Sequence, residues 1–252
     1  MHNFEILKKS TFPVIIEDGN GVPKLQTGTG FILNYAGDYY VLTAWHCISS
    51  VIKKVYSLYD DFSITNEDIK YIIEKYIFFG AIESAKDIYR IPLNQVYCAI
   101  ESIGNRADIL ICRVDMESFI NKKNTSLEDL NPLELYNGNL DINSEYHVWG
   151  YPQRLTKITD KHTKTSLEHR CLRLVKINPL QNNPLIFETG ILDFSLTKDT
   201  FSRLEGFSGG AITNGNAQVV GLAYEITNDK EMRFITINSI QYMLQEIIQN
   251  QN

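Results

Sequence analysis

The sequence lacks the features that mark secreted, membrane-spanning and nucleic-acid-binding proteins. Its first 20 residues contain no unbroken apolar stretch followed by small residues, so they do not resemble a secretory signal. No segment approaches the roughly 18 consecutive apolar residues of a membrane helix. Basic residues number 24 against 30 acidic ones, and the formal charge of −6 argues against a nucleic-acid surface. We therefore expect a cytoplasmic protein with no membrane and no nucleic-acid partner.

Cysteine is scarce as well, and its pattern excludes two further classes of protein. The four cysteines are scattered without the spacing of metal ligands, at Cys47, Cys98, Cys112 and Cys171. In a chain of 252 residues without an export signal, a disulfide framework is not expected. The sequence therefore predicts buried free thiols.

Short runs of β-forming residues, separated by turn signals, dominate the chain. One hairpin is predicted where "TGTGFILNY" is followed by the turn "AGD" and by "YYVLTAWH". A second is predicted in "AITNGNAQVVGLA", where "NGN" separates two apolar-rich strands. Two segments have helical periodicity, 65–77 with Thr65 or Asn66 as the N-cap, and 237–249. The polar stretch 115–132 is the best candidate for a connection between two β-rich halves, with about a dozen strands in all.

The stretch "GFSGGAI", residues 206–212, places a serine between glycines. Gly206 allows backbone conformations that a side chain would forbid. The N–H groups of Gly206 and Ser208 can then converge on one point and form an oxyanion hole, which stabilises negative charge on a substrate oxygen. A glycine-rich β-turn with an incidental serine is the alternative, and this motif alone leaves the two interpretations about even.

A serine hydroxyl becomes a good nucleophile only when a base takes its proton. Of the five histidines, only His46 ends a hydrophobic strand and enters a short helical turn, "AWHCISSV". We expect His2 in a mobile tail, His162 and His169 in an exposed loop, and His147 inside a strand. By itself, the stretch around His46 also fits a core histidine or a metal ligand.

A histidine base needs an acceptor that fixes its tautomer. Asp108 begins the apolar run "DILICRV" and is the best candidate. A carboxylate at the start of a buried strand is usually a surface cap, and this alternative stays open. Asp87, Asp115 and Asp193 have less apolar surroundings and fit worse.

Together, "LTAWHC" around His46, "ADILICRV" around Asp108 and "GFSGGAI" around Ser208 resemble the trypsin-like (chymotrypsin-fold) serine peptidases of the bacterial type, in the family's order His, Asp, Ser. "GTGFIL" resembles the strand that leads towards the histidine. "VWGYP" resembles an element frequent in bacterial members, and "VVGLAYE" resembles the strand that lines the substrate cleft. The resemblance runs from about residue 28 to residue 250.

This resemblance implies an all-β fold of two six-stranded antiparallel barrels, with a short helical insertion in the first half and a C-terminal helix. Residues 1–125 would form the first barrel, which carries His46 and Asp108 and includes the insertion near 63–77. Residues 126–252 would form the second barrel. The two barrels make one peptidase unit.

The resemblance also implies a mechanism. Ser208 attacks a carbonyl of a protein or peptide substrate, His46 takes the proton and returns it to the leaving amine, and Asp108 orients His46. The N–H groups of Gly206 and Ser208 hold the oxyanion. No cofactor and no metal is needed.

By resemblance, the primary substrate pocket is walled by residues of two segments: Ser202, Glu205, Tyr224, Glu225 and Ile226. Glu205 or Glu225 facing inward would favour Lys or Arg in the substrate. Exposed glutamates are the commoner case.

Three positions depart from the family pattern. Phe207 stands where many members have an acid that pairs with a new N-terminus, so activation by zymogen cleavage is not expected, and Phe207 should pack against apolar neighbours. Thr27 stands near the place of the cysteine that pairs with the counterpart of Cys47, so that disulfide is absent. Trp45 replaces a small residue before the histidine. The nearest kin are expected among peptidases of the HtrA type, although no PDZ-sized segment follows.

Two rival functions stay open. The first is a pseudoprotease that uses the fold as a binding module for peptides or proteins. The second is a latent intracellular peptidase whose loops are ordered by a regulatory protein partner, with 60–95 and 153–170 as docking surfaces. A role in bacterial stress or phage defence fits by class analogy.

Overall fold

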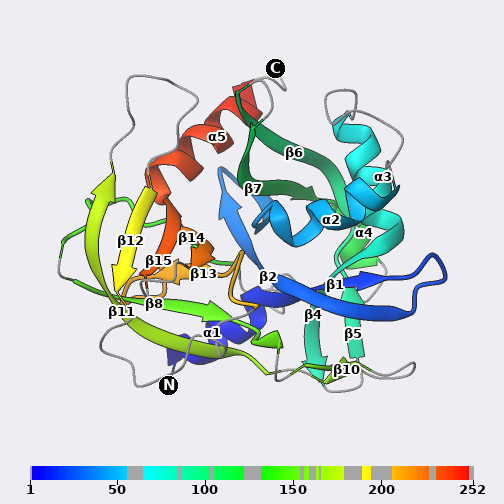
Figure 1. Ribbon diagram of the computed structural model, residues 1–252, viewed down its shortest axis with the longest axis horizontal. Coiled ribbons are helices and arrows are strands. Elements are labelled where there is room, and N and C mark those ends of the chain that lie inside the picture. Colours follow the sequence, from blue (N-terminus) through cyan, green and yellow to red (C-terminus); the bar gives the residue numbers. More distant parts are fainter. Residues whose placement is uncertain are drawn as a thin grey trace.

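The strands of the computed structural model fall into two antiparallel systems that lie side by side, one built by each half of the chain (Figure 1). The residues that the structure describes are 2–55, 65–84, 87–102, 105–121, 132–142, 144–153, 156–158, 163–164, 166–178, 189–193, 206–226 and 231–249.

The N-terminal half forms a seven-stranded half-barrel in the order β5–β4–β1–β2–β3–β7–β6, with all neighbours antiparallel. Its strands are β1 (Thr11–Glu17), β2 (Pro23–Tyr35), β3 (Asp38–Thr43), β4 (Ile77–Ser84), β5 (Asp87–Arg90), β6 (Leu93–Ser102) and β7 (Asn105–Val114). The family resemblance implied a six-stranded antiparallel barrel here, and the structure has seven strands. The difference arises because β4 and β5 follow the helical insertion directly and extend the sheet beyond β1.

The C-terminal half forms the predicted closed barrel of six strands, in the order β11–β12–β15–β14–β13–β8. Its strands are β8 (Glu145–Gly150), β11 (Glu168–Asn178), β12 (Thr189–Asp193), β13 (Ala211–Thr213), β14 (Val219–Ile226) and β15 (Glu231–Thr236). A two-stranded ribbon of β9 (Lys157–Ile158) and β10 (Thr163–Lys164) lies outside it. The predicted chymotrypsin-like, all-β class is therefore confirmed.

Both predicted hairpins are present. Ala36 and Gly37 link β2 to β3, and their φ angles are 53° and 88°. Positive φ at both central residues defines a type I′ turn, whose twist matches that of the paired strands. Between β13 and β14, the side-chain oxygen of Asn214 accepts hydrogen bonds from the N–H groups of Asn216 (2.9 Å) and Gln218 (3.0 Å).

The two predicted helices are confirmed as α3 (Asn66–Tyr76) and α5 (Ile237–Gln249). At the start of α3, the Thr65 hydroxyl accepts from the Asp68 N–H (3.2 Å), and the Asp68 carboxylate accepts from the Thr65 N–H (2.9 Å). This capping box satisfies two N–H groups that no helical carbonyl can reach. None of the helices in the described ranges combines the length and apolar character needed to cross a membrane.

Two helices were not predicted from the sequence, α1 (His2–Ser10) and α4 (Met116–Asn121). A third, α2 (His46–Val55), is longer than the short helical turn predicted at His46. The expectation of a mobile tail around His2 is wrong, because α1 is anchored by the fully buried Leu7. His169 lies in β11 and not in a loop, whereas His162 lies outside the described residues.

The cysteines bear out the prediction in part. Cys47 and Cys112 are free and buried, as expected, but Cys171 is free and exposed. The exposure of Cys171 follows from its place on β11, where it alternates with the buried Leu172 and so points away from the barrel interior. The side chain of Cys98 is not among those described.

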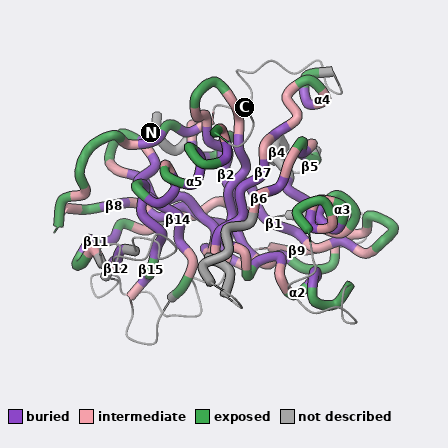
Figure 2. Tube along the Cα trace, turned by 90° about the horizontal axis from the view of Figure 1, so that it is seen from above, coloured by how far each residue is buried: buried purple, intermediate pink, exposed green. Residues whose placement is uncertain are grey.

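Two apolar cores hold the molecule together, and the buried segments run through its centre in Figure 2. The larger core joins both halves, since it contains Phe31 of β2, Trp149 of β8 and Leu244 of α5. The smaller core fills the barrel, and its members are Tyr146, Val148, Leu172, Leu174, Leu192, Phe207, Ile212, Val220, Ala223, Met232 and Phe234.

Candidate active site

His46 is the first residue of α2, immediately after the buried end of β3. The Trp45 carbonyl accepts from the N–H groups of Ile48 and Ser49, both at 3.0 Å, which starts the helix. Ile48 is fully buried and fixes α2 against the sheet. The backbone of His46 is therefore held rigidly, while its side chain stays 45% exposed.

Asp108 reaches His46 from the neighbouring strand. In this antiparallel pair, Thr43 of β3 lies opposite Leu110 of β7. Asp108, two residues before Leu110, therefore lies next to the segment that follows Thr43 and begins α2. One carboxylate oxygen of Asp108 lies 2.6 Å from His46 Nδ1, and the other accepts from the His46 N–H at 2.8 Å. Both the ring and the backbone of the histidine are thus fixed by one carboxylate.

The same contact controls the protonation of His46. Burial lowers the pKa of the imidazole, but the hydrogen bond with Asp108 and the proximity of Cys47 raise it, and the net result is a pKa of about 10. The imidazolium form is therefore strongly stabilised beside Asp108. Asp115, one of the rejected candidates, instead accepts from the N–H and hydroxyl of Ser118 in α4 (3.0 and 2.6 Å).

Ser208 lies next to Cys47, the residue that follows His46. Its carbonyl oxygen accepts from the Thr29 N–H at 2.8 Å and lies 3.6 Å from the Cys47 sulfur. Its hydroxyl donates to the Tyr224 carbonyl at 3.5 Å, and within the described part of the chain it makes no hydrogen bond to His46. A protonated imidazole offers no acceptor to a hydroxyl, which agrees with this orientation.

Glycines shape the loop that carries Ser208. Gly206 and Gly209 have φ angles of 99° and 82°, which L side chains rarely adopt. A Cβ on Gly209 would also overlap the Thr29 carbonyl and the Thr43 hydroxyl. Within the described residues, the N–H groups of Gly206 and Ser208 have no hydrogen-bond acceptor. Both are therefore available to a ligand oxygen.

Phe207 fastens this loop to the barrel. It is fully buried in the smaller core, so the prediction that it packs against apolar neighbours is confirmed. Its ring fills the space above Gly150, where an added Cβ would lie 2.7 Å from the ring. The side chain at this position thus holds the loop by apolar contact and not by an ion pair.

The predicted substrate-pocket residues are only partly placed. Ser202 and Glu205 lie outside the described residues, and only the backbone of Ile226 is described. The carbonyl of the half-buried Tyr224 meets the Ser208 hydroxyl. Glu225 forms an ion pair with Arg233 (2.9 Å), and both side chains are about half exposed. This pairing offsets the charge of Glu225, one of the two glutamates that would have favoured a basic substrate.

Sequence reasoning missed the residues of β2 that hold the serine loop. Thr29, inside the quoted motif "GTGFIL", contacts Gly206, Ser208 and the segment after β8. Gly28, not Thr27, is the residue that faces Cys47, because a Cβ on Gly28 would overlap the Cys47 sulfur. The glycines on either side of Thr29 were the signal of a close approach between backbones.

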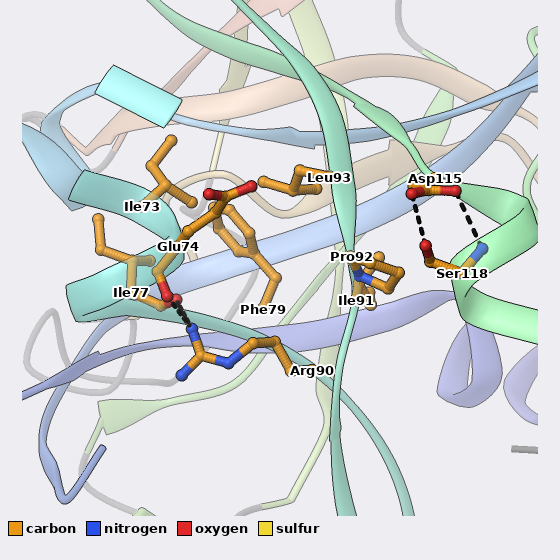
Figure 3. Close-up of a pocket in the computed structure, with 10 residues that line it drawn as sticks. All are labelled: Ile73, Glu74, Ile77, Phe79, Arg90, Ile91, Pro92, Leu93, Asp115 and Ser118. Atoms are coloured by element: carbon orange, nitrogen blue, oxygen red, sulfur yellow. Dashed lines mark hydrogen bonds between the residues drawn. The ribbon is translucent and has the colours of Figure 1, made fainter. Parts of the chain in front are cut away.

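A pocket of about 330 Å³ lies elsewhere, between α3, β4 and α4 (Figure 3). Its guanidinium group, from Arg90, donates to the carbonyls of Glu74 (2.7 Å) and Ile77 (3.1 Å) and pairs with Glu17. The pocket contains no triad residue, and its lining is Ile73, Glu74, Ile77, Phe79, Arg90, Ile91, Pro92, Leu93, Asp115 and Ser118. Among the described residues, no cluster of His, Cys, Asp or Glu could hold a metal ion.

No family model matches the chain, and no curated protein matches it. Solved structures do. A serine-to-alanine mutant of Rv3671c from M. tuberculosis H37Rv, in its inactive form, has a TM-score of 0.56 at 13% identity and covers 99% of this chain and 92% of its own. The scabies mite inactivated protease paralogue S-I1 has a TM-score of 0.56 at 18% identity, with coverage of 97% and 96%. Human heparin binding protein has a TM-score of 0.55 at 11% identity, and the match covers 95% of this chain and 92% of that protein.

These similarities establish the fold. The chain has the chymotrypsin fold of the trypsin-like serine proteases, at low sequence identity to its neighbours. The neighbours include a protease in its active form and an inactivated paralogue, so the fold alone does not distinguish an active enzyme from an inactive relative.

Proposed function

We propose that the protein is a serine endopeptidase that acts inside the cell through His46, Asp108 and Ser208. The observation that carries the proposal is the two-point contact of the Asp108 carboxylate with the Nδ1 and N–H of His46. A strand cap would need only a backbone contact. A carboxylate that also holds Nδ1 fixes the ring so that Nε2 is left for a second partner, and Ser208 is the hydroxyl on the adjoining loop.

The reaction begins when His46 has lost the proton from Nε2. The Ser208 hydroxyl then turns from the Tyr224 carbonyl to Nε2, which takes its proton as the oxygen attacks the peptide carbonyl carbon. The negative charge that develops on the carbonyl oxygen is stabilised by the N–H groups of Gly206 and Ser208. The tetrahedral intermediate breaks its C–N bond, the proton passes from Nε2 to the leaving amine, and water later releases the acyl group by the same steps.

Control by a protein partner is part of the proposal. The support is the arrangement in which the Ser208 hydroxyl faces Tyr224 and the His46 pKa is about 10, because neither favours attack at neutral pH. A partner that docks on residues 60–95 or 153–170, which the structure describes in part, would favour the attacking arrangement by binding it more tightly.

A fluorophosphonate probe tests the proposal, since only an activated serine reacts with it. We expect wild-type protein to be labelled at Ser208 and at a rate that increases with pH, and Ser208→Ala to show no labelling while its circular dichroism is unchanged. Folded wild-type protein that resists the probe from pH 7 to pH 10 would contradict the peptidase. Peptide binding by that unreactive protein would support the binding module, which the orientation of the Ser208 hydroxyl favours.

A further inference from the structure

We propose that Thr29 is the positioning residue of the oxyanion hole, an inference that rests on the peptidase function above. Its hydroxyl holds the carbonyl of Gly206, and so the peptide group between Gly206 and Phe207, which lies between the two peptide groups that carry the Gly206 and Ser208 N–H donors. Thr29 lies on β2, in the other half of the molecule from the serine loop, and it is fully buried. The half-barrel would thus set the geometry of a catalytic element that the barrel carries.

The side chain of Thr29 bridges two segments of the C-terminal half. Its hydroxyl donates to the Gly206 carbonyl at 2.6 Å and accepts from the Tyr151 N–H at 2.9 Å. One donor and one acceptor of the hydroxyl are thus engaged, with the bond from the Tyr151 N–H buried and the bond to the Gly206 carbonyl half-buried. Loss of the hydroxyl would leave the buried Tyr151 N–H without a partner, which is costly, and would release the Gly206 carbonyl.

The backbone of Thr29 holds the other end of the same loop. Its N–H donates to the Ser208 carbonyl at 2.8 Å, and its own carbonyl accepts from the Thr43 hydroxyl at 2.7 Å. One residue therefore binds the carbonyls of both Gly206 and Ser208, whose N–H groups are the two expected oxyanion donors.

Gly206 depends on such a contact because it has no side chain of its own to restrain it. A Cβ there would overlap the Tyr151 carbonyl and lie 2.8 Å from the Gln153 nitrogen, so the position accepts only glycine. A glycine rotates freely about φ and ψ, and the direction of its N–H is set by how its peptide groups are held. With its carbonyl released, the peptide group after Gly206 is no longer anchored, and rotation about the φ and ψ of this glycine could then turn the N–H away from the position of the substrate oxygen.

A second layer of hydrogen bonds keeps Thr29 and Tyr151 in register. The Gln26 side chain donates to the Tyr151 carbonyl and to the Gly28 carbonyl, and Thr156 donates to the Gln26 side chain. The segment that supplies the Tyr151 N–H is therefore tied to β2 at Gln26 as well as at Thr29. The hydroxyl meets a preorganised acceptor and donor, as a positioning role requires.

The test compares Thr29→Val, which removes the hydroxyl at constant shape, with Thr29→Ser, which keeps it. Thr213→Val is the matched control, because Thr213 is also buried and its hydroxyl accepts one hydrogen bond, from Trp149 Nε1 (2.9 Å), away from the loop. The measurements are the second-order rate of fluorophosphonate labelling, kcat and KM on a peptide ester, and the His46 titration followed by NMR. Each variant is first shown to be folded by its thermal transition.

We expect Thr29→Val to lower the labelling rate and kcat by about 10²-fold, close to the loss of one oxyanion donor. KM and the His46 titration should stay unchanged, since ground-state binding and the base are untouched. Thr29→Ser should restore most of the rate, and Thr213→Val should keep it. If Thr29→Val fails to fold, Thr29→Cys, whose thiol is a weaker donor, replaces it with the same expected direction.

Two results would overturn the inference in distinguishable ways. Wild-type labelling with an equal rate in Thr29→Val, or an equal loss in Thr29→Ser or Thr213→Val, would refute the role of the hydroxyl and leave the peptidase standing. A wild-type protein that is folded and never labelled would remove the peptidase, and with it the hole that Thr29 is proposed to position.

Discussion

Replacing Phe207 with alanine removes a fully buried ring from the middle of the oxyanion loop. Truncation of a buried phenylalanine to alanine usually costs about 3 to 5 kcal/mol of unfolding free energy, because a cavity adds to the lost apolar burial. Domains are typically stable by about 5 to 15 kcal/mol, so we expect Phe207→Ala to fold with reduced stability. The ring also fixes Gly206 and Ser208 on either side of it, so catalysis should suffer beyond the loss of stability.

The matched control is Phe234→Ala. Phe234 belongs to the same core and is 1% exposed, but it lies on β15 and not on the oxyanion loop. We expect both variants to lose a similar amount of unfolding free energy in urea titrations. Only Phe207→Ala should also slow fluorophosphonate labelling in the folded protein, by about 10- to 1,000-fold, the upper end being the full loss of one oxyanion donor. An equal slowing in both variants, or an unchanged rate in Phe207→Ala, would show that the loop is held by its hydrogen bonds alone.

Four further expectations follow from the triad and the N-terminal helix. Ser208→Ala should abolish peptide hydrolysis and keep its thermal transition; residual activity near wild type would remove Ser208 from the mechanism. Asp108→Asn should lower kcat by about 10⁴-fold and bring the His46 pKa down, as NMR titration can show; an unchanged rate would make Asp108 a strand cap. Because the folded pKa of His46 is raised to about 10 from 6.5, kcat/KM should rise with pH towards 10. The same shift means that the unfolding free energy contributed by the His46–Asp108 pair should be fully present below pH 6.5 and should disappear as pH rises through about 10. A tag fused before Met1 should leave labelling unchanged, and activity that appears only after trimming would refute this.

The sequence was sufficient for the features that depend on local chemistry. The hairpin turn at Ala36 and Gly37 and the helix N-cap, for which Thr65 or Asn66 was predicted and Thr65 is found, are each set by residues within four positions of one another. The choice of Asp108 over Asp115 was also made from local composition, and the structure brings Asp108 against His46 while Asp115 caps α4. Short-range patterns carried the turn and the helix start because those interactions are themselves short-range, whereas Asp108 meets His46 across 62 residues and was chosen only by the character of its own strand.

Features that depend on distant pairings were not predicted. Thr29 contacts Gly206 across 177 residues and Tyr151 across 122, and no periodicity connects such positions. The pairing of β1 with β4 is likewise invisible in either strand alone, so the seventh strand of the half-barrel was missed. Helix α1 carries little amphipathic pattern and is fixed by the burial of Leu7 against the sheet. Tertiary packing overrides weak local preference in these cases.

The larger core has a consequence for how the molecule unfolds. Apolar side chains from β2, β8, β14 and α5 belong to one continuous cluster, so opening either half exposes the core that both share, although the smaller core belongs to the barrel alone. A cut in the connecting stretch 115–132 would expose apolar surface on both fragments instead of releasing two folded units. Heat or denaturant should therefore melt the chain in a single cooperative transition, and the packing between the halves should be lost at the same temperature as the strands that form it.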